Sequence, residues 1–102
     1  MIHIHISFYV PKENRKKFFR GGLLNDGLYT RLNIIFALSK YVHNGSPIHG
    51  TAKQPDGSYH VYYNLLANNL EDWEIFDQEK DWNKLHDSLL CTVEDLSIDV
   101  KK

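Results

Sequence analysis

The chain contains 102 residues, of which 42% are hydrophobic and 25% are charged, and its formal net charge is −1. This composition is typical of a globular protein and excludes a disordered chain. The length suits a single domain over residues 1–102, because domains most often contain roughly 100–150 residues. Cys91 is the only cysteine. An internal disulfide and a four-cysteine zinc site are therefore excluded, and we expect a cytoplasmic location.

Charge is distributed unevenly along the chain. Residues 1–55 contain eight Lys or Arg and two acidic residues, whereas residues 56–102 contain four Lys and eleven acidic residues. An asymmetry of this size can mark an interaction surface. No apolar run approaches the roughly 18 residues of a membrane-spanning helix, so we expect no membrane association.

The first predicted element is a strand over residues 2–10. Apolar residues alternate with polar ones from Ile2 to Val10, which is typical of a strand with one buried face. Pro11 ends this strand and suits the first position of a helix, which we expect to extend to Arg20. Gly21 and Gly22 should stop that helix.

A second helix is predicted to begin near Asn25 or Asp26, since both residue types are good N-caps. Its apolar stripe is wide, which indicates burial on most sides, and it includes Leu28, Leu32, Ile35, Phe36 and Val42. Gly45 should terminate the helix and Pro47 should prevent its restart.

A β-hairpin follows. In the segment Gln54-Pro55-Asp56-Gly57-Ser58, proline suits the first turn position and glycine allows a positive φ. The two strands of the hairpin should cover roughly residues 48–54 and 58–66.

The C-terminal part predicts one helix and one strand. Asn68, with Glu71 three residues later, resembles a capping box. Helix is expected from Leu70 to Cys91, although residues 73–76 would also suit a short strand. The alternation of apolar and polar residues from Leu96 to Val100 predicts a last strand.

The order of these elements predicts an α+β fold of the ferredoxin-like βαββαβ type. In this sandwich, helices cover one face of an antiparallel four-stranded sheet. The first and third strands are central, the last strand lies beside the first, and the second face of the sheet is open.

The open face of the predicted sheet gathers polar and aromatic side chains. Imidazole titrates nearest to neutrality of all side chains, so a histidine-rich surface is a candidate site. We predict that this face binds a second copy of the chain, because aromatic side chains give a large contact area at low entropic cost. Its binding residues would be His3, His5, Tyr9, His60, Tyr62 and Asp99, with Ser7, Asn64 and Ser97 on the same face.

Two alternative interpretations give this face a metal. Two histidines that are two positions apart on a strand point the same way, so His3 and His5 can combine with His60 and Asp99 as metal ligands. The segment His3-Ile4-His5 also resembles the His-hydrophobic-His element of HUH endonucleases. That resemblance implies a metal paired with a tyrosine nucleophile. The preferred interpretation assigns neither a metal nor a cofactor to the chain.

A third alternative is two-histidine phosphoesterase chemistry. His5-Ile6-Ser7 and His49-Gly50-Thr51 resemble the paired His-x-Ser/Thr elements of these enzymes. However, the predicted hairpin register places His49 on the Tyr63 face of the sheet, away from His60.

Nucleic-acid binding has two candidate surfaces. Tyr9, His60 and Tyr62 resemble the base-stacking platform of RNA-recognition sheets. The first helix is basic and can bind phosphate groups through Lys12, Arg15, Lys16 and Arg20. Its charge can also serve solubility, or complement the acidic stretch over residues 71–81 if the first and last helices lie side by side.

One faint resemblance covers the N-terminal part. The first strand followed by Pro11 to Phe19 is similar to small dimeric α+β-barrel oxygenases, which implies a dimer and oxygenase activity. The long segment from Gly21 to Gly45 does not fit that family. The functional prediction therefore rests on the residues and the charge distribution.

No complete catalytic constellation is visible in the sequence. The sequence therefore predicts a small non-enzymatic binding module, a homodimer that docks on a protein or a nucleic-acid-handling complex, as small viral inhibitors do. The alternative is a histidine-dependent phosphodiesterase or nuclease that uses His3, His5 and His60.

Overall fold

The computed structural model of the chain describes residues 1–20 and 27–102, without the side chains of residues 46–48. Gly21, Gly22, Asn25 and Asp26, which were assigned to a helix end and a helix start, lie outside the described residues. The elements, in chain order, are β1 (Ile2–Val10), η1 (Lys12–Asn14), α1 (Arg15–Phe19), α2 (Leu28–Leu38), β2 (His43–Lys53), β3 (Tyr59–Ala67), α3 (Leu70–Asp77), α4 (Lys80–Thr92) and β4 (Glu94–Lys101).

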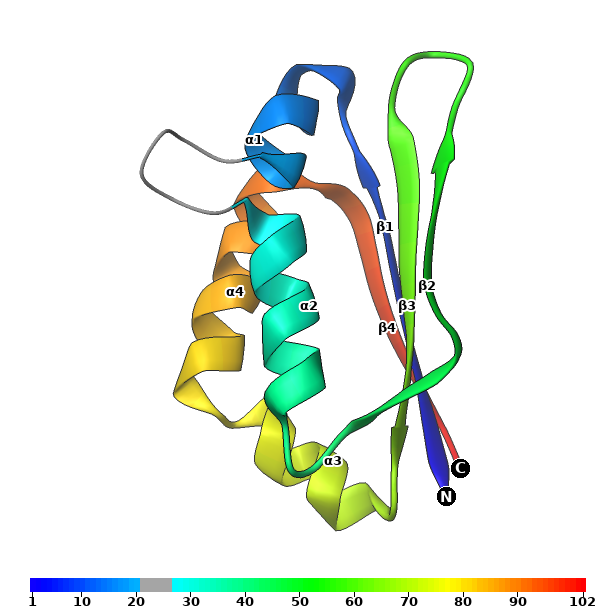
Figure 1. The fold of residues 1–102 in the computed structure, drawn as a ribbon, viewed down its shortest axis with the longest axis vertical. Coiled ribbons are helices and arrows are strands. Elements are labelled where there is room, and N and C mark those ends of the chain that lie inside the picture. Colours follow the sequence, from blue (N-terminus) through cyan, green and yellow to red (C-terminus); the bar gives the residue numbers. More distant parts are fainter. Residues whose placement is uncertain (21–26) are drawn as a thin grey trace.

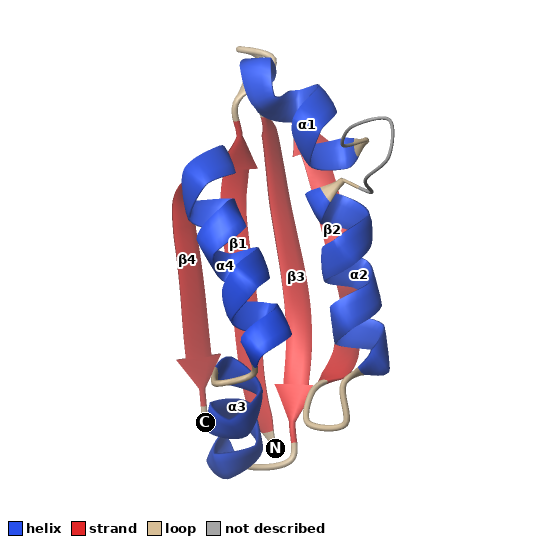
Figure 2. Cartoon of the chain, turned by 90° about the vertical axis from the view of Figure 1, so that its left-hand side faces the viewer, coloured by secondary structure: helices blue, strands red, loops and turns tan. Residues whose placement is uncertain are grey.

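The four strands form one antiparallel sheet in the order β2-β3-β1-β4. The helices cover one face of this sheet, and the other face carries no helix (Figures 1 and 2). The predicted ferredoxin-like α+β fold, with its central first and third strands, is confirmed. None of the described helices is long and apolar enough to cross a membrane.

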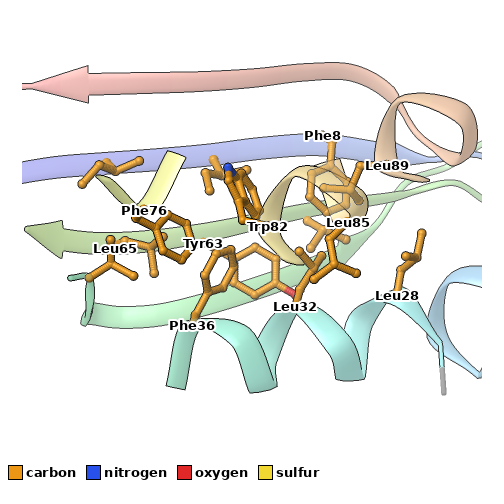
Figure 3. Packing of buried hydrophobic residues seen from close by; sticks show 14 of the residues in the cluster. Phe8, Leu28, Leu32, Phe36, Tyr63, Leu65, Phe76, Trp82, Leu85 and Leu89 are labelled. Carbon is orange, nitrogen blue, oxygen red and sulfur yellow. The ribbon is translucent and has the colours of Figure 1, made fainter. Parts of the chain in front are cut away.

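The hydrophobic core lies between the sheet and the helices (Figure 3). The five apolar residues of β1 all point into it, as the alternation predicted. Phe8, Tyr63 and Trp82 are among the largest fully buried side chains. The ring of Phe36 on α2 meets Tyr63 edge-on at 5.2 Å and Trp82 at 5.6 Å, so this residue joins the helical layer to the sheet.

The β2–β3 hairpin has the predicted turn. The Gln54 amide donates to the Ser58 carbonyl at 2.8 Å, and Gly57 takes a φ of 91°. The Asp56 carboxylate accepts hydrogen bonds from the Ser58 hydroxyl and amide, which lower the pKa of Asp56. The turn fixes which residues of β2 and β3 lie opposite each other.

The second helix is shorter than predicted. It ends at Leu38, and Ser39 is already extended. The Ser39 hydroxyl accepts from the amides of Tyr41 and Val42 and so holds the turn that leads into β2. Gly45 therefore lies within β2 and does not terminate a helix. The apolar stripe misled the prediction because Val42 is buried in the core from a loop position.

The predicted helix from Leu70 to Cys91 is two helices, α3 and α4, separated by Gln78 and Glu79. The side chain of Asn69 caps α3 by accepting from the Asp72 amide at 2.8 Å, so Asn68 is not the cap. The break lets the buried Trp82 donate from Nε1 to Asp77 at 3.0 Å.

The basic and acidic segments lie at opposite ends of the molecule. Figures 1 and 2 both place α1 at one end of the sheet and α3, with the start of α4, at the other. The suggestion that the basic helix complements the acidic stretch over residues 71–81 is therefore wrong.

Candidate functional site

Two tyrosines and one histidine meet between the helices and the sheet. Tyr29 comes from the first turn of α2, His49 from β2 and Tyr63 from β3. The Tyr29 hydroxyl and Nε2 of His49 share a hydrogen bond of 2.7 Å. The imidazole also stacks on the Tyr63 ring, with centroids 5.7 Å apart and planes at 29°. We call these three residues the Tyr-His-Tyr cluster.

Local features of the chain position this cluster. The hairpin turn sets His49 opposite Tyr63, and β2 carries an irregularity between Asn44 and His49. Tyr29 is brought to His49 because α1 and the start of α2 pack closely. A Cβ at Gly27 would lie 2.6 Å from the Phe18 carbonyl oxygen, so only glycine permits this approach.

A small pocket of about 220 Å³ adjoins the cluster. Aromatic and amide side chains line it, namely Asn33 and Phe36 of α2, Asn44 and His49 of β2, and Tyr63 of β3. Ligand pockets in proteins combine apolar walls with a few polar groups that orient the ligand. This pocket has both kinds of surface, and an imidazole lies among the polar groups.

Two buried polar atoms of the cluster have no hydrogen-bond partner among the described residues. They are Nδ1 of His49 and the hydroxyl oxygen of Tyr63. Burial, assisted by the neighbouring Tyr29, raises the pKa of Tyr63 well above the ordinary value for tyrosine. Tyr63 is therefore a neutral phenol at physiological pH and can donate a hydrogen bond. An unpaired buried polar group lowers the free energy of unfolding. Such groups therefore point to a functional site.

Replacing Tyr63 with phenylalanine should therefore stabilise the protein. Removing the unpaired hydroxyl is expected to raise the free energy of unfolding by about 1 kcal/mol, or the melting temperature by about 4–8 °C. The parent protein should also lose stability above about pH 10, because the unfolded chain then gives up a tyrosine proton that folded Tyr63 keeps. Thermal denaturation monitored by circular dichroism tests both effects. Equal stability of the two proteins at pH 7 and pH 11 would contradict this account.

The residues predicted for the open sheet face share that face. Strand register sets His5 between Asn64 and Asp99, and Tyr9 opposite His60. Nδ1 of His5 and Oδ1 of Asn64 are 2.8 Å apart. Two ring pairs stack, His5 on Tyr62 at 5.9 Å and Tyr9 on His60 at 4.7 Å. The polar and aromatic side chains of this face thus contact one another across neighbouring strands.

Two further predictions concern a metal site on this face and the pair of His-x-Ser/Thr elements. Among the described residues, no group of three or more His, Cys, Asp or Glu side chains is arranged to hold a metal ion. His49 lies opposite Tyr63 and away from His60, as the hairpin register predicted. The two His-x-Ser/Thr elements therefore lie on opposite faces of the sheet.

The basic residues of the first helix are divided between two surfaces. The side chain of Lys12 lies beside Gly57 of the hairpin turn, where a glycine Cβ would be 3.0 Å from its Cδ. Arg15, Lys16 and Arg20 line a separate cleft. Lys12 and the other three basic residues therefore line different hollows of the surface.

Sequence reasoning did not identify the Tyr-His-Tyr cluster. Tyr29 is not part of the apolar stripe predicted for the second helix, and Tyr63 belongs to the strand face that was predicted to pack against the helices. His49 was assigned to the correct face, but that face was treated only as core. A histidine that register places against buried aromatic residues was the available signal, since a buried imidazole needs a polar partner.

No protein-family model and no curated protein matches this chain. Solved structures do match it over nearly its whole length. An antibiotic biosynthesis monooxygenase is 10% identical with a TM-score of 0.67, covering 100% of this chain and 97% of that one. A candidate antibiotic biosynthesis monooxygenase from Deinococcus radiodurans is 13% identical with a TM-score of 0.64, covering 100% and 91%. A variant of SnoaB, a cofactor-independent oxygenase from Streptomyces nogalater, is 10% identical with a TM-score of 0.65, covering 99% and 90%.

These likenesses show the fold. They also overturn the predicted function, because the three matching proteins described above are named as oxygenases or monooxygenases. The prediction of a non-enzymatic docking module, with its comparison to small viral inhibitors, is wrong, and so is the nuclease alternative. The segment from Gly21 to Gly45, which was thought not to fit the oxygenases, contains α2, and the alignments span the whole chain.

Proposed function

We propose that the chain is a cofactor-independent oxygenase whose active site is the pocket beside the Tyr-His-Tyr cluster. The observation that carries the proposal is the His49 imidazole. It is held by Tyr29 through one nitrogen and has its other nitrogen buried and unpaired within the described residues, in a pocket with aromatic walls. The fold neighbours include one protein described as a cofactor-independent oxygenase.

Such an enzyme requires a substrate that reduces dioxygen itself. Hydroxyaromatic compounds meet this requirement, because removal of the phenolic proton creates an electron-rich anion. When Nε2–H of His49 donates to the Tyr29 hydroxyl, the Nδ1 lone pair is available to accept that proton. Tyr29 is then a positioning residue that selects the productive tautomer of the imidazole.

The reaction can be written for 1-naphthol. Its proton passes to His49, and the carbon para to the oxygen bonds to dioxygen. The proton on His49 then passes to the resulting peroxide anion, which gives a hydroperoxide and restores the neutral imidazole. Loss of water then leaves 1,4-naphthoquinone, so one oxygen atom enters the product and the other leaves as water. Tyr63 is held neutral by burial and can donate to the oxyanion that develops. Asn33 and Asn44 supply further polar groups.

The pocket volume limits the substrate. Its 220 Å³ is below the roughly 300–1,000 Å³ that is usual for drug-sized ligands. One or two fused rings would enter, which favours a naphthol-sized compound or one end of a longer molecule.

An oxygen electrode and quinone absorbance test this proposal. The protein should consume oxygen and form quinone with 1-naphthol or related hydroxynaphthalenes. It should do neither with 1-methoxynaphthalene, which has no acidic proton. Oxygen uptake that is equal for the two compounds, or absent from a panel of mono- and dihydroxynaphthalenes, would overturn the proposal.

We also propose that two copies of the chain associate through their open sheet faces. The charged residues at the centre of this face are few, and its paired rings offer the aromatic area that interfaces favour. The Tyr62 ring lies against Gly50 of β2, where a Cβ would be 2.4 Å from two of its ring atoms, so the two strands are joined on this face by an aromatic contact that needs glycine.

Replacing Ser7 with arginine should separate the two copies. Ser7 lies at the middle of the face, between Tyr62 and Ser97, so each arginine would bury an unpaired charge in the interface. Light scattering should give the mass of a dimer for the parent protein and of a monomer for Ser7→Arg. Asn83→Arg on the exposed surface of α4 is the control and should remain dimeric. A monomeric parent protein would refute this interface.

A further inference from the structure

A second cavity, distinct from the pocket at the cluster, lies between α1 and the hairpin. Its volume is about 410 Å³. It is lined by three cationic residues, two aromatic residues and one threonine, namely Arg15, Lys16, Arg20, Phe19, Tyr59 and Thr51. We call it the basic cleft.

Among the described residues, no carboxylate neutralises the charge in the basic cleft. In the part of the chain that the structure describes, no carboxylate forms an ion pair with Arg15, Lys16 or Arg20. The acidic residues of α3 and of the start of α4 lie at the other end of the molecule (Figure 2). Three like charges around one cavity repel each other, so an anion bound there would be stabilised by all three.

The walls of the basic cleft are aromatic. The rings of Phe19 and Tyr59 meet edge-on with centroids 5.4 Å apart. The Arg15 guanidinium lies 5.9 Å from the centroid of the Tyr59 ring, a cation–π contact that orients it. A planar apolar body would therefore find rings to pack against beside the cations.

We propose that the basic cleft binds an aromatic carboxylate. The guanidinium groups of Arg15 and Arg20 match the planar carboxylate through paired hydrogen bonds, and Lys16 adds a point charge. The rings of Phe19 and Tyr59 hold the aromatic part of the ligand. The ion pairs alone would not hold the ligand, because exposed ion pairs contribute little in water, so the aromatic contacts are also needed.

A small ligand fits the charge distribution better than a nucleic acid. A nucleic-acid backbone needs a basic track that continues along the surface. Here three cations line one cavity. Lys12 lines a different hollow, which Glu13, Asp56, Glu94 and Asp95 also line. The acidic groups would repel phosphates that extended in this direction.

The basic cleft is close to the proposed active site but is not part of it. Phe19 lines the cleft and packs on Tyr29 with ring centroids 5.3 Å apart, and Tyr29 holds His49. Binding at the cleft does not depend on the oxygenase proposal, and it is measured without turnover.

Calorimetry with 2-naphthoate tests the inference, with 2-naphthalenemethanol as the uncharged counterpart. The parent protein should bind the carboxylate at least about tenfold more tightly than the alcohol. The double variant Arg15→Gln with Arg20→Gln should lose this preference, while circular dichroism shows an unchanged fold. Lys12→Gln and Lys17→Gln remove one charge each from the same segment outside the cleft, and both should bind 2-naphthoate like the parent protein.

Three results would overturn the inference. One is equal affinity for the carboxylate and the alcohol, and another is an equal loss of affinity in Lys12→Gln and in the double variant. The third is tighter binding of an oligothymidylate than of 2-naphthoate, since this would make the basic surface a nucleic-acid site. Competition by millimolar inorganic phosphate should be weak, because phosphate lacks the aromatic body.

Discussion

Replacement of His49 with glutamine is expected to lower oxygen uptake with a hydroxynaphthalene by about 100-fold or more. A positioned general base contributes typically 10²–10⁴-fold to a rate. Glutamine can still form a hydrogen bond with Tyr29, but it cannot accept a proton from the substrate. The oxygen electrode gives kcat and KM, and the loss should fall mainly on kcat because the pocket keeps its shape.

Two other variants separate this role from a structural one. His86→Gln changes an imidazole on α4, outside the pocket, and should retain the parent rate. Tyr63→Phe should be more stable than the parent protein but about 100-fold slower, because the pocket loses a buried hydrogen-bond donor. If His49→Gln keeps the parent rate, His49 is not the base.

Replacement of Trp82 with alanine is expected to destabilise the protein by about 3–5 kcal/mol. The Trp82 side chain is fully buried and packs on Phe36 at 5.6 Å and Phe76 at 5.4 Å. Its loss would leave a cavity where α2, α3 and α4 meet, and would free the Asp77 carboxylate. A small domain of this size has little stability to spare.

Chemical denaturation with urea measures this change as a shift in the midpoint at constant slope. Ile34→Ala is the matched control, because Ile34 is also apolar but 48% exposed on α2. Ile34→Ala should lower the free energy of unfolding by less than about 1 kcal/mol. Similar losses in the two variants would show that Trp82 does not organise the helical layer.

The sequence predicted the sheet better than the helices. Alternation from Ile2 to Val10 gave the first strand with its correct limits, and the residues from Gln54 to Ser58 gave the hairpin turn. Both signals are local. The end of α2 has no local signal, because Val42 continues the helical spacing of apolar residues although it packs into the core from a turn. The break before α4 depends likewise on where Trp82 packs.

The candidate site was harder to predict because its residues come from three distant segments. Tyr29, His49 and Tyr63 each resemble core residues when taken alone. Only the packing of α1 against α2 brings the Tyr29 hydroxyl to within 2.7 Å of His49. His3 and His5 are easier to recognise because only Ile4 separates them in sequence, yet they lie on the other face of the sheet.

The irregularity in β2 has a consequence for how this pocket can change. Between the pairs Asn44–Leu65 and His49–Tyr63, β2 advances by five positions while β3 advances by two. The hairpin turn alone determines that His49 faces Tyr63. Insertions or deletions in the bulged stretch would therefore reshape the rim near Asn44 and leave the histidine and tyrosine aligned. Length variation there offers evolution, or an engineer, a way to alter substrate size without rebuilding the catalytic pair.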